Sequence, residues 1–353
     1  MSTDAIAIPE DEAHGIKSVP SAGHLTSGPA SPYAPYWHPI APSSAVTDKP
    51  ARFMLLGEAL VAFRTSEGLG VFKDLCVHRG APLSMGWVEN DRITCPYHGF
   101  QYDITGRCRR IPSIPEDQGI PKKVNAIAYQ SQDAYGLVWV ALAEPVAPIM
   151  PWPEFADPDW RALEPLHYSW NASAGRIVEN YLDAAHFPFV HDGLLGKRED
   201  TLIDPYHHTL ERTERGLTFY LDQEEPAAPD TDEGEKLRLT YTAYMPFVCQ
   251  LVKTTSRGET HVPLFVCPKS DTESDLFCPI LRNVDREPEQ DDGYVYIVDT
   301  AAKEDRVIVE SQRPEQLPLD LAEEMHIKVP DAAGVLYRRL LRDVEAGVFA
   351  ATG

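Results

Sequence analysis

Short apolar runs separated by turn residues occupy the chain from Trp37 to about Leu142. Strand-length runs bounded by Gly, Asp and Asn predict a small all-β domain. The clearest of these runs are Arg52–Phe63, Gly70–Asp74 and Gly136–Leu142. The preceding residues, 1–35, are rich in Pro, Ser, Ala and Gly and have neither a helical nor a strand period. We therefore expect residues 1–35 to form a disordered N-terminal arm.

A proline-rich stretch, Glu144–Asp159, marks the end of the β-rich part of the chain. The expected division is an arm at 1–35, an all-β domain at 36–150 and a second domain at 151–353. The acidic segment Asp222–Glu235, which two prolines interrupt, is expected to be a mobile loop.

The second domain has a mixed pattern of helical and strand periods. Helices are predicted over Gly175–Ala185, with a break at Pro188, and over Ala333–Ala346. Another helix is expected to begin near Ala301, with Thr300 as its cap. Strands are predicted at Leu237–Thr255, Thr260–Cys267, Leu276–Arg282 and Tyr294–Asp299.

Charge and cysteine content narrow the possible functions. The 353 residues include 54 acidic and 32 basic side chains, a formal net charge of −22 that disfavours binding to nucleic acid or anionic lipid. No apolar run approaches the ~20 residues of a membrane span, and the chain start does not resemble a secretory signal. Six cysteines in such a chain indicate a reducing cytoplasm, with metal ligands or reactive thiols in place of a disulfide framework.

Four of the residues that bind metals well are concentrated in two short motifs. These are Cys76-Val77-His78 and Cys95-Pro96-Tyr97-His98. Residues i and i+2 of an extended segment point to one side, and Pro96 with Gly99 favours a turn between Cys95 and His98. Two thiolates and two imidazoles can therefore share one site. The other cysteines have no such neighbours and are expected to be small buried side chains: Cys108, Cys249, Cys267 and Cys278.

Two kinds of metal site use this donor set. A Cys₂His₂ zinc site more often has the closer cysteine spacing and the helical histidine spacing of a finger. A Rieske cluster has two cysteines on one iron and two histidines on the other, with one of each from each loop. The flanking Arg79-Gly80 and Phe100-Gln-Tyr-Asp also resemble the Rieske [2Fe–2S] domain. Imidazole ligands raise the reduction potential, so such a cluster would accept electrons from a ferredoxin-type donor.

A second candidate metal site lies in the segment from Glu179 to His191. Asn180, Asp183 and His186 follow at three-residue steps and form a polar stripe on the predicted helix. His186 and His191 are five residues apart, which places them about 140° apart on an ideal helix. Both can reach one metal only if the helix is broken, and Pro188 predicts that break.

Two histidines need a carboxylate to complete the facial triad that holds non-haem iron(II). The segment from Glu304 to Gln312 supplies candidates, of which Asp305 is the preferred ligand and Glu304 and Glu310 are alternatives. A further alternative is that Glu304 and Asp305 only complement the N-terminus of a helix.

Together the two motif sets resemble the oxygenase component of Rieske non-haem iron oxygenases, over about Trp37 to the C-terminus. The chain is most similar to the group of vanillate and dicamba O-demethylases, methylxanthine N-demethylases and saxitoxin-pathway hydroxylases. The matching segments are 180–196, 304–314 and 337–341. The resemblance implies an α+β fold: an N-terminal all-β Rieske domain followed by a helix-grip-like catalytic domain of antiparallel sheet plus helices.

The resemblance also implies an activity and its cofactors. Cys76, His78, Cys95 and His98 would hold a [2Fe–2S] cluster. A mononuclear iron would be bound by His186, His191 and Asp305. Electrons would come from a separate ferredoxin-type reductase that uses NAD(P)H. With O₂, the enzyme would hydroxylate or demethylate an aromatic or heterocyclic small molecule. Two features depart from the family pattern: residues 1–30 have no counterpart, and Phe100 stands where Trp is frequent.

The same resemblance implies a head-to-tail homotrimer. Asp183 would then bridge His186 and His98 of a neighbouring subunit, with Asn180 beside it as a second candidate catalytic residue. Three other functions stay open: a cis-dihydroxylating ring dioxygenase, a Rieske electron-transfer protein without oxygenase activity, and a zinc-bound hydrolase.

The walls of a substrate pocket are expected from the strands at Tyr241–Thr255 and Thr260–Cys267. Candidate substrate contacts on them are Met245, Phe247, Cys249, Gln250 and His261.

Overall fold

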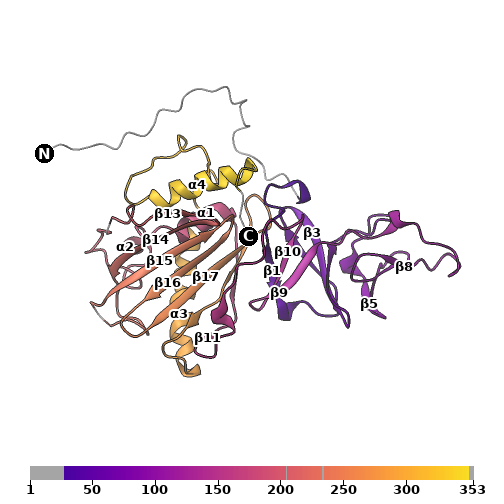
Figure 1. Ribbon diagram of the computed structural model, residues 1–353, viewed down its shortest axis with the longest axis horizontal. Helices are drawn as coiled ribbons and strands as arrows, with labels where there is room; N and C mark the ends of the chain where they lie inside the picture. The colour runs from indigo at the N-terminus through magenta and orange to yellow at the C-terminus, as the bar shows by residue number, and fades with distance from the viewer. Residues whose placement is uncertain (1–27, 204, 233, 350–353) are drawn as a thin grey trace.

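The computed structural model describes residues 28–203, 205–232 and 234–349. The molecule is elongated, with small sheets at one end and a large sheet covered by helices at the other (Figure 1). This is the expected order of an all-β part followed by a mixed part. Within the described ranges, no helix is both long enough and apolar enough to cross a membrane.

The N-terminal part consists of three antiparallel sheets. In the first, β10 (Leu137–Ala141) lies between β1 (His38–Pro42) and β9 (Gln130–Ala134). The second has the order β2 (Ala51–Leu55), β3 (Glu58–Thr65), β4 (Gly68–Lys73). The third has the order β5 (Trp87–Glu89), β6 (Arg92–Thr94), β7 (Gln101–Tyr102), β8 (Cys108–Arg110).

The apolar run predicted at Arg52–Phe63 is a hairpin of two strands, β2 and β3. Leu56 and Gly57 turn the chain between them, with φ of 51° and 73°. Positive φ at both central residues is the requirement of a tight two-residue hairpin turn, which glycine meets without strain. The run is mostly apolar because β3 and the end of β2 contribute buried side chains.

The C-terminal part is built on one antiparallel sheet of nine strands. Seven of them have the order β11-β19-β17-β16-β15-β14-β13, and β18 pairs with both β17 and β12. Their bounds are β11 (Arg161–Ala162), β12 (Leu166–Trp170), β13 (Glu211–Thr213), β14 (Gly216–Glu224), β15 (Lys236–Tyr244), β16 (Val248–Thr254), β17 (Glu259–Pro268), β18 (Ser274–Cys278) and β19 (Leu281–Arg282).

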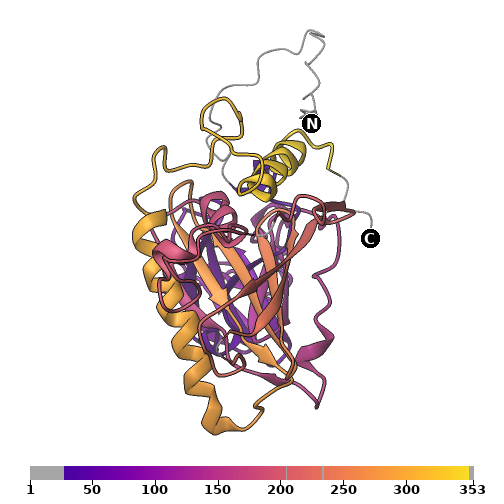
Figure 2. The same cartoon turned by 90° about the vertical axis from the view of Figure 1, so that its left-hand side faces the viewer.

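Four α-helices pack around this sheet: α1 (Ala174–Tyr181), α2 (Phe187–Val190), α3 (Asp291–Val309) and α4 (Ala332–Glu345). Helix α1 packs on β16, β17 and α3, and α4 packs on β14 and α1. Helix α3 runs along one side of the sheet, and α4 lies across its end (Figure 2). Short 3₁₀ helices occur at Gly28–Ala30, Ser43–Ala45, Leu83–Met85, Lys122–Val124, Pro153–Phe155 and Pro288–Gln290.

The strand predicted at Tyr294–Asp299 is wrong, because these residues belong to α3. The run is rich in aromatic and β-branched residues, which favour strands. The residues from this part of the chain that line the cavity, however, are at positions 294, 297, 298, 301 and 302, which recur at helical spacing. Helix α3 therefore begins at Asp291, ten residues before the predicted start. Glu304 and Asp305 lie in its C-terminal half, so they do not complement a helix N-terminus.

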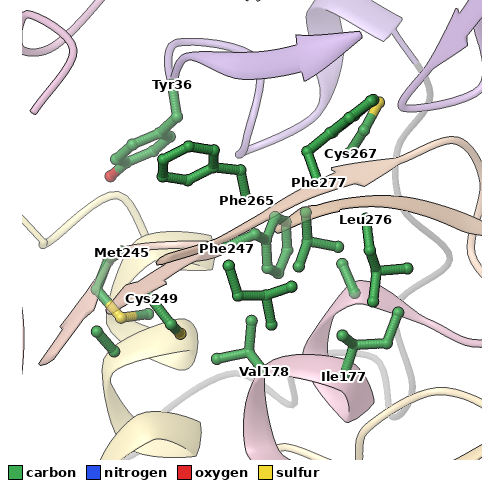
Figure 3. Packing of buried hydrophobic residues seen from close by; sticks show 14 of the residues in the cluster. Tyr36, Ile177, Val178, Met245, Phe247, Cys249, Phe265, Cys267, Leu276 and Phe277 are labelled. Carbon is green, nitrogen blue, oxygen red and sulfur yellow. The ribbon is translucent and has the colours of Figure 1, made fainter. Parts of the chain in front are cut away.

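A hydrophobic core joins the two parts of the molecule. Figure 3 shows Phe247, from the turn before β16, and Cys249 of β16 packed near Val178 of α1, with Phe265 next to Tyr36 of the N-terminal part. A separate, smaller core lies around Cys76 and the third N-terminal sheet. The cysteine motifs thus have a hydrophobic support of their own.

Two segments that were predicted to lack order are packed. Residues 1–27 of the predicted arm lie outside the described residues, but Tyr33 and Ala34 are 3% and 0% exposed. The Tyr33 hydroxyl also donates to Glu345 at 2.7 Å, so the prediction of a disordered arm is wrong for 28–35. The acidic segment is not an exposed loop either. Glu225 and Asp230 are buried there because Lys253 of β16 supplies a counter-charge.

Candidate metal centres and the adjoining cavity

Two loops with the same local structure present the four predicted cluster residues. The Gly80 N–H donates to the Cys76 carbonyl at 2.8 Å, and the Gly99 N–H donates to the Cys95 carbonyl at 3.0 Å. Both glycines have positive φ, 77° and 67°, a conformation that side chains with a Cβ rarely adopt. The glycine four residues after each cysteine therefore closes each loop.

The two loops bury their thiols and expose their imidazoles. Cys76 and Cys95 are each 1% exposed, whereas His78 and His98 lie at the surface with ring centroids 4.6 Å apart. Phe100, where the family often has Trp, stacks on His78 at 4.7 Å. This arrangement fits a cluster with one iron held by buried thiolates and one by exposed imidazoles. The donor set therefore fits a Rieske centre.

Replacing Cys95 with alanine is expected to abolish the visible absorption of the purified protein. Alanine provides no thiolate, and the cluster has no other ligand at that corner. Absorption spectra and total iron measure the effect. The matched control is Cys108→Ala, which removes another buried thiol from the same small core and should leave the spectrum intact. A Cys95→Ala protein with a full spectrum would contradict the cluster assignment.

The second predicted donor set also comes together. The Nε2 atoms of His186 and His191 are 3.2 Å apart, and each lies 3.3 Å or 3.1 Å from Asp305 Oδ1. Among the described residues, this is the only group of three or more such ligands whose atoms lie within 4.8 Å of one another. Asp305 Oδ1 is buried and makes no hydrogen bond to any residue that the structure describes. Two ring nitrogens and one carboxylate oxygen that converge without donors between them fit a bound cation, as in a facial triad.

Helix α2 positions the two histidines, although not as predicted. Helix α1 already ends at Tyr181, and Pro188 lies in the first turn of α2, where its missing N–H is not needed. The prediction that Pro188 breaks a helix between the histidines is therefore wrong. His186 precedes α2 and His191 follows it with non-helical dihedrals, φ −114° and ψ 39°. This departure from helical geometry turns the two rings toward one point.

Carboxylates also hold the other nitrogen of each ring. His191 Nδ1 lies 2.8 Å from Glu304 Oε2, and His186 Nδ1 lies 3.6 Å from Asp183 Oδ2. Such contacts orient metal-binding imidazoles so that Nε2 faces the metal. Burial by itself lowers the pKa of His186, but Asp183 and Asp305 raise it to about 9 in the metal-free chain.

The remaining predicted residues near this centre have different places. Asn180 lines the adjoining cavity. Glu310, an alternative ligand, accepts hydrogen bonds from the Asn171 N–H at 2.8 Å and from Arg306 at 2.8 Å, away from the triad. Glu304 contacts only the outer nitrogen of His191, so Asp305 is the carboxylate that completes the triad.

A cavity enclosing about 1140 Å³, its mouth included, opens beside His186, His191 and Asp305. As predicted, β15, β16 and β17 supply much of its wall. The residues from these strands are Leu239, Tyr241, Leu251, Lys253, Thr260, Val262 and Leu264. Helices α1 and α3 supply the opposite wall.

The predicted substrate contacts are not in this wall. Because side chains alternate along a strand, Gln250 and His261 lie on the opposite face of the sheet from Leu251 and Thr260, and they contact each other at 3.2 Å. Cys249 and Phe247 belong to the hydrophobic core with Met245 (Figure 3). The prediction that these side chains contact a substrate in the cavity is therefore wrong.

Three charged cavity residues were not predicted from the sequence: Glu225, Asp230 and Lys253. One signal could have identified them. Lys253 lies within the predicted strand Leu237–Thr255, and a lysine that a sheet buries requires a paired carboxylate. The acidic segment that precedes the strand was the nearest source of one.

Comparison with known proteins gives matches over both parts of the chain. Residues 36–128 match the Rieske [2Fe-2S] domain, and residues 170–347 match the vanillate O-demethylase oxygenase C-terminal domain. Methylxanthine N1-demethylase NdmA of Pseudomonas putida is 31% identical over 328 residues, which cover 88% of each chain. Methylxanthine N3-demethylase NdmB of the same species is 30% identical over 79% of this chain and 81% of its own length.

Solved structures agree with these matches. The structure of Pseudomonas putida NdmA with caffeine has a TM-score of 0.79 and 27% identity, over 89% of this chain and 92% of that one. The structure of dicamba monooxygenase bound to dicamba has a TM-score of 0.74 over 89% and 97% of the two chains. Its identity is 19%, so this likeness concerns the fold alone.

Proposed function

Because the chain belongs to the Rieske oxygenase family that joins a Rieske [2Fe–2S] domain to a vanillate O-demethylase-type oxygenase domain, we propose that it removes a methyl group from nitrogen or oxygen of an aromatic or heterocyclic small molecule. It is the oxygenase component, an oxidoreductase with a [2Fe–2S] cluster and a mononuclear iron, and a separate reductase supplies its electrons. The observation that carries the proposal is the triad of His186, His191 and Asp305 at an apolar cavity.

The side chains around the triad have defined tasks in this reaction. When bound, the mononuclear iron activates O₂ for insertion into a C–H bond of the methyl group. Glu304 accepts from His191 Nδ1, and the Asp183 carboxylate lies close to His186 Nδ1, so both Nε2 atoms stay directed at the iron. The apolar walls exclude water and hold the methyl group close to the triad.

Demethylation follows from hydroxylation of the methyl group. With O₂, two electrons and two protons, one oxygen atom enters the methyl C–H bond and the other leaves as water. The hydroxymethyl group on nitrogen or oxygen breaks its bond to that atom and departs as formaldehyde. NdmA and NdmB, both demethylases by name, match most of this chain, which supports this outcome over cis-dihydroxylation.

We also propose that copies of this chain form a head-to-tail homotrimer in the cytoplasm. The sheet containing β5 and β8 lies at the opposite end of the long axis from α2 (Figure 1), so the cluster-binding end of one chain is remote from its own α2. Asp183 is 40% exposed beside His186, which leaves its carboxylate open to His98 of the partner subunit. The six unpaired cysteines support a reducing compartment.

The test is product analysis with a reconstituted reductase, NADH and a panel of N-methyl heterocycles and methoxyarenes. We expect formaldehyde in equal amount to the demethylated product, and about three irons per chain. A vicinal diol product would replace the proposal with cis-dihydroxylation. About two irons per chain and no oxygen uptake with any compound would indicate an electron-transfer protein.

A further inference from the structure

A cluster of buried charges forms part of the cavity wall. Lys253 Nζ lies 2.9 Å from Glu225 Oε2 and 3.0 Å from Asp230 Oδ1, and the three side chains are 12%, 4% and 4% exposed. All three line the cavity, as do Asp305 and Tyr294, which are eleven residues apart on α3. That separation corresponds to about 16 Å along a helix. The cavity therefore extends well beyond the triad, and the charges belong to its wall.

The cluster has one negative charge too many. Two carboxylates face a single ammonium, and the other contacts are neutral donors: Gln223 Nε2 to Glu225, and the Thr231 and Thr260 hydroxyls to Asp230. Burial raises the pKa of Glu225. This direction is expected of a carboxylate in an apolar wall whose negative charge is only partly balanced by a nearby cation. A cation from outside the chain would balance the cluster.

A second observation indicates a ligand at the same wall. Tyr241 is 1% exposed and lines the cavity, yet its hydroxyl has no hydrogen-bond partner in the part of the chain that the structure describes. Its ring is held by stacking on Phe219 at 4.9 Å and by an edge contact with Tyr181 at 6.2 Å. Burial raises the pKa of the Tyr241 hydroxyl, and the negative charge of Glu225 raises it further. A buried hydroxyl without a partner requires an explanation, and a bound ligand provides one.

We propose that this cavity binds its substrate as an organic cation, whose N–H groups donate to the Glu225–Asp230 carboxylate pair and whose polar atoms hydrogen-bond the Tyr241 hydroxyl. Ammonium, amidinium and guanidinium groups have this chemistry. The inference rests on the proposed demethylase function, because the substrate's methyl group then lies at the triad end of the cavity. The apolar remainder of the wall suits a carbon framework between the two ends: Ile177, Leu239, Leu251, Leu264, Ile297 and Val298.

Charge also argues against an anionic substrate. Both carboxylates already approach Lys253 within 3.0 Å, so an incoming anion would meet two like charges for one opposite charge. The formal net charge of −22 repels anions and attracts cations at longer range.

Equilibrium binding to the oxidised holoenzyme, without reductase, tests the inference. Three probes share a methoxyphenyl ring and a short chain: the methyl ethers of tyramine (a cation), tyrosol (neutral) and phloretic acid (an anion). We expect calorimetry to show the cation binding about tenfold or more tightly than the neutral probe, with the anion weakest. Asp230→Asn and Glu225→Gln should each remove most of this preference. Tyr241→Phe should weaken the cation several-fold.

The matched control is Asp222→Asn, which removes a half-buried carboxylate of β14 that pairs with Arg238 on the neighbouring strand β15. It should leave the preference unchanged, and the cluster spectrum of every variant reports its folding. Equal affinities for cation and neutral probe, or no binding of the cation, would overturn the inference. The inference would also be overturned if the anionic probe bound most tightly and lost that binding in Lys253→Met. Formaldehyde release without a cation preference would sink this inference alone. A cation preference without formaldehyde would sink only the demethylase proposal.

Discussion

Asp305→Ala is expected to lose the mononuclear iron and all turnover while retaining the visible spectrum of the cluster. The substitution removes the only anion of the triad, whose Oδ1 lies 3.3 Å and 3.1 Å from the two Nε2 atoms. Two neutral imidazoles alone hold iron(II) weakly in water, because hard divalent ions favour a carboxylate ligand. Iron analysis should fall from about three to about two per chain, and formaldehyde release should fall to background.

Glu304→Ala is the matched control, one residue away on the same helix. Glu304 Oε2 contacts His191 Nδ1 at 2.8 Å and takes no place in the triad. Removing this outer partner should weaken iron binding about 10- to 100-fold, so excess iron(II) should restore occupancy. Excess iron(II) should not restore Asp305→Ala. If Asp305→Ala kept its full iron content and activity and Glu304→Ala lost both, the carboxylate ligand would be Glu304 and not Asp305.

Asp183→Asn should separate electron supply from metal binding. The amide keeps the shape of the side chain and can still accept from the Ala185 N–H, which now donates at 2.6 Å. Unlike a carboxylate, the amide has only one acceptor oxygen. It therefore cannot accept from two imidazoles at once, His186 in the same chain and His98 of the partner subunit. We therefore expect both metal sites to remain occupied, while reoxidation of the pre-reduced cluster slows about 10- to 100-fold.

Rapid mixing of the pre-reduced protein with oxygen and a substrate from the product screen measures this rate. Asp192→Asn is the control, since Asp192 is similarly exposed near the same centre and pairs only with Arg198. Its reoxidation should be normal. Near-normal reoxidation in Asp183→Asn as well would contradict the role of Asp183 as a bridge between subunits. Support for the trimer would then have to come from sedimentation analysis.

The spacing of residues along the sequence was sufficient to predict the features that depend only on neighbouring residues. The two cysteine–histidine motifs predict loops that present thiol and imidazole together, and the structure has both loops, each closed by a glycine four residues after its cysteine. The helix predicted at Ala333–Ala346 agrees with α4 to within one residue at each end. Such elements depend on turn geometry and on one repeating period, which a short stretch of sequence contains.

Longer-range relations required the tertiary structure. The run at Tyr294–Asp299 has strand propensity, yet it forms part of helix α3, which packs on α1 and lines the cavity. That change places Asp305 beside the two histidines, of which His186 keeps helical dihedrals before α2 and His191 leaves them at its end. By itself, the sequence determined which side chains could bind iron and in which two groups. The packing of α3 against the sheet decided which carboxylate meets the histidines. The register of β15, β16 and β17 decided which alternate residues face the cavity, because a strand's neighbours set the direction of every side chain along it.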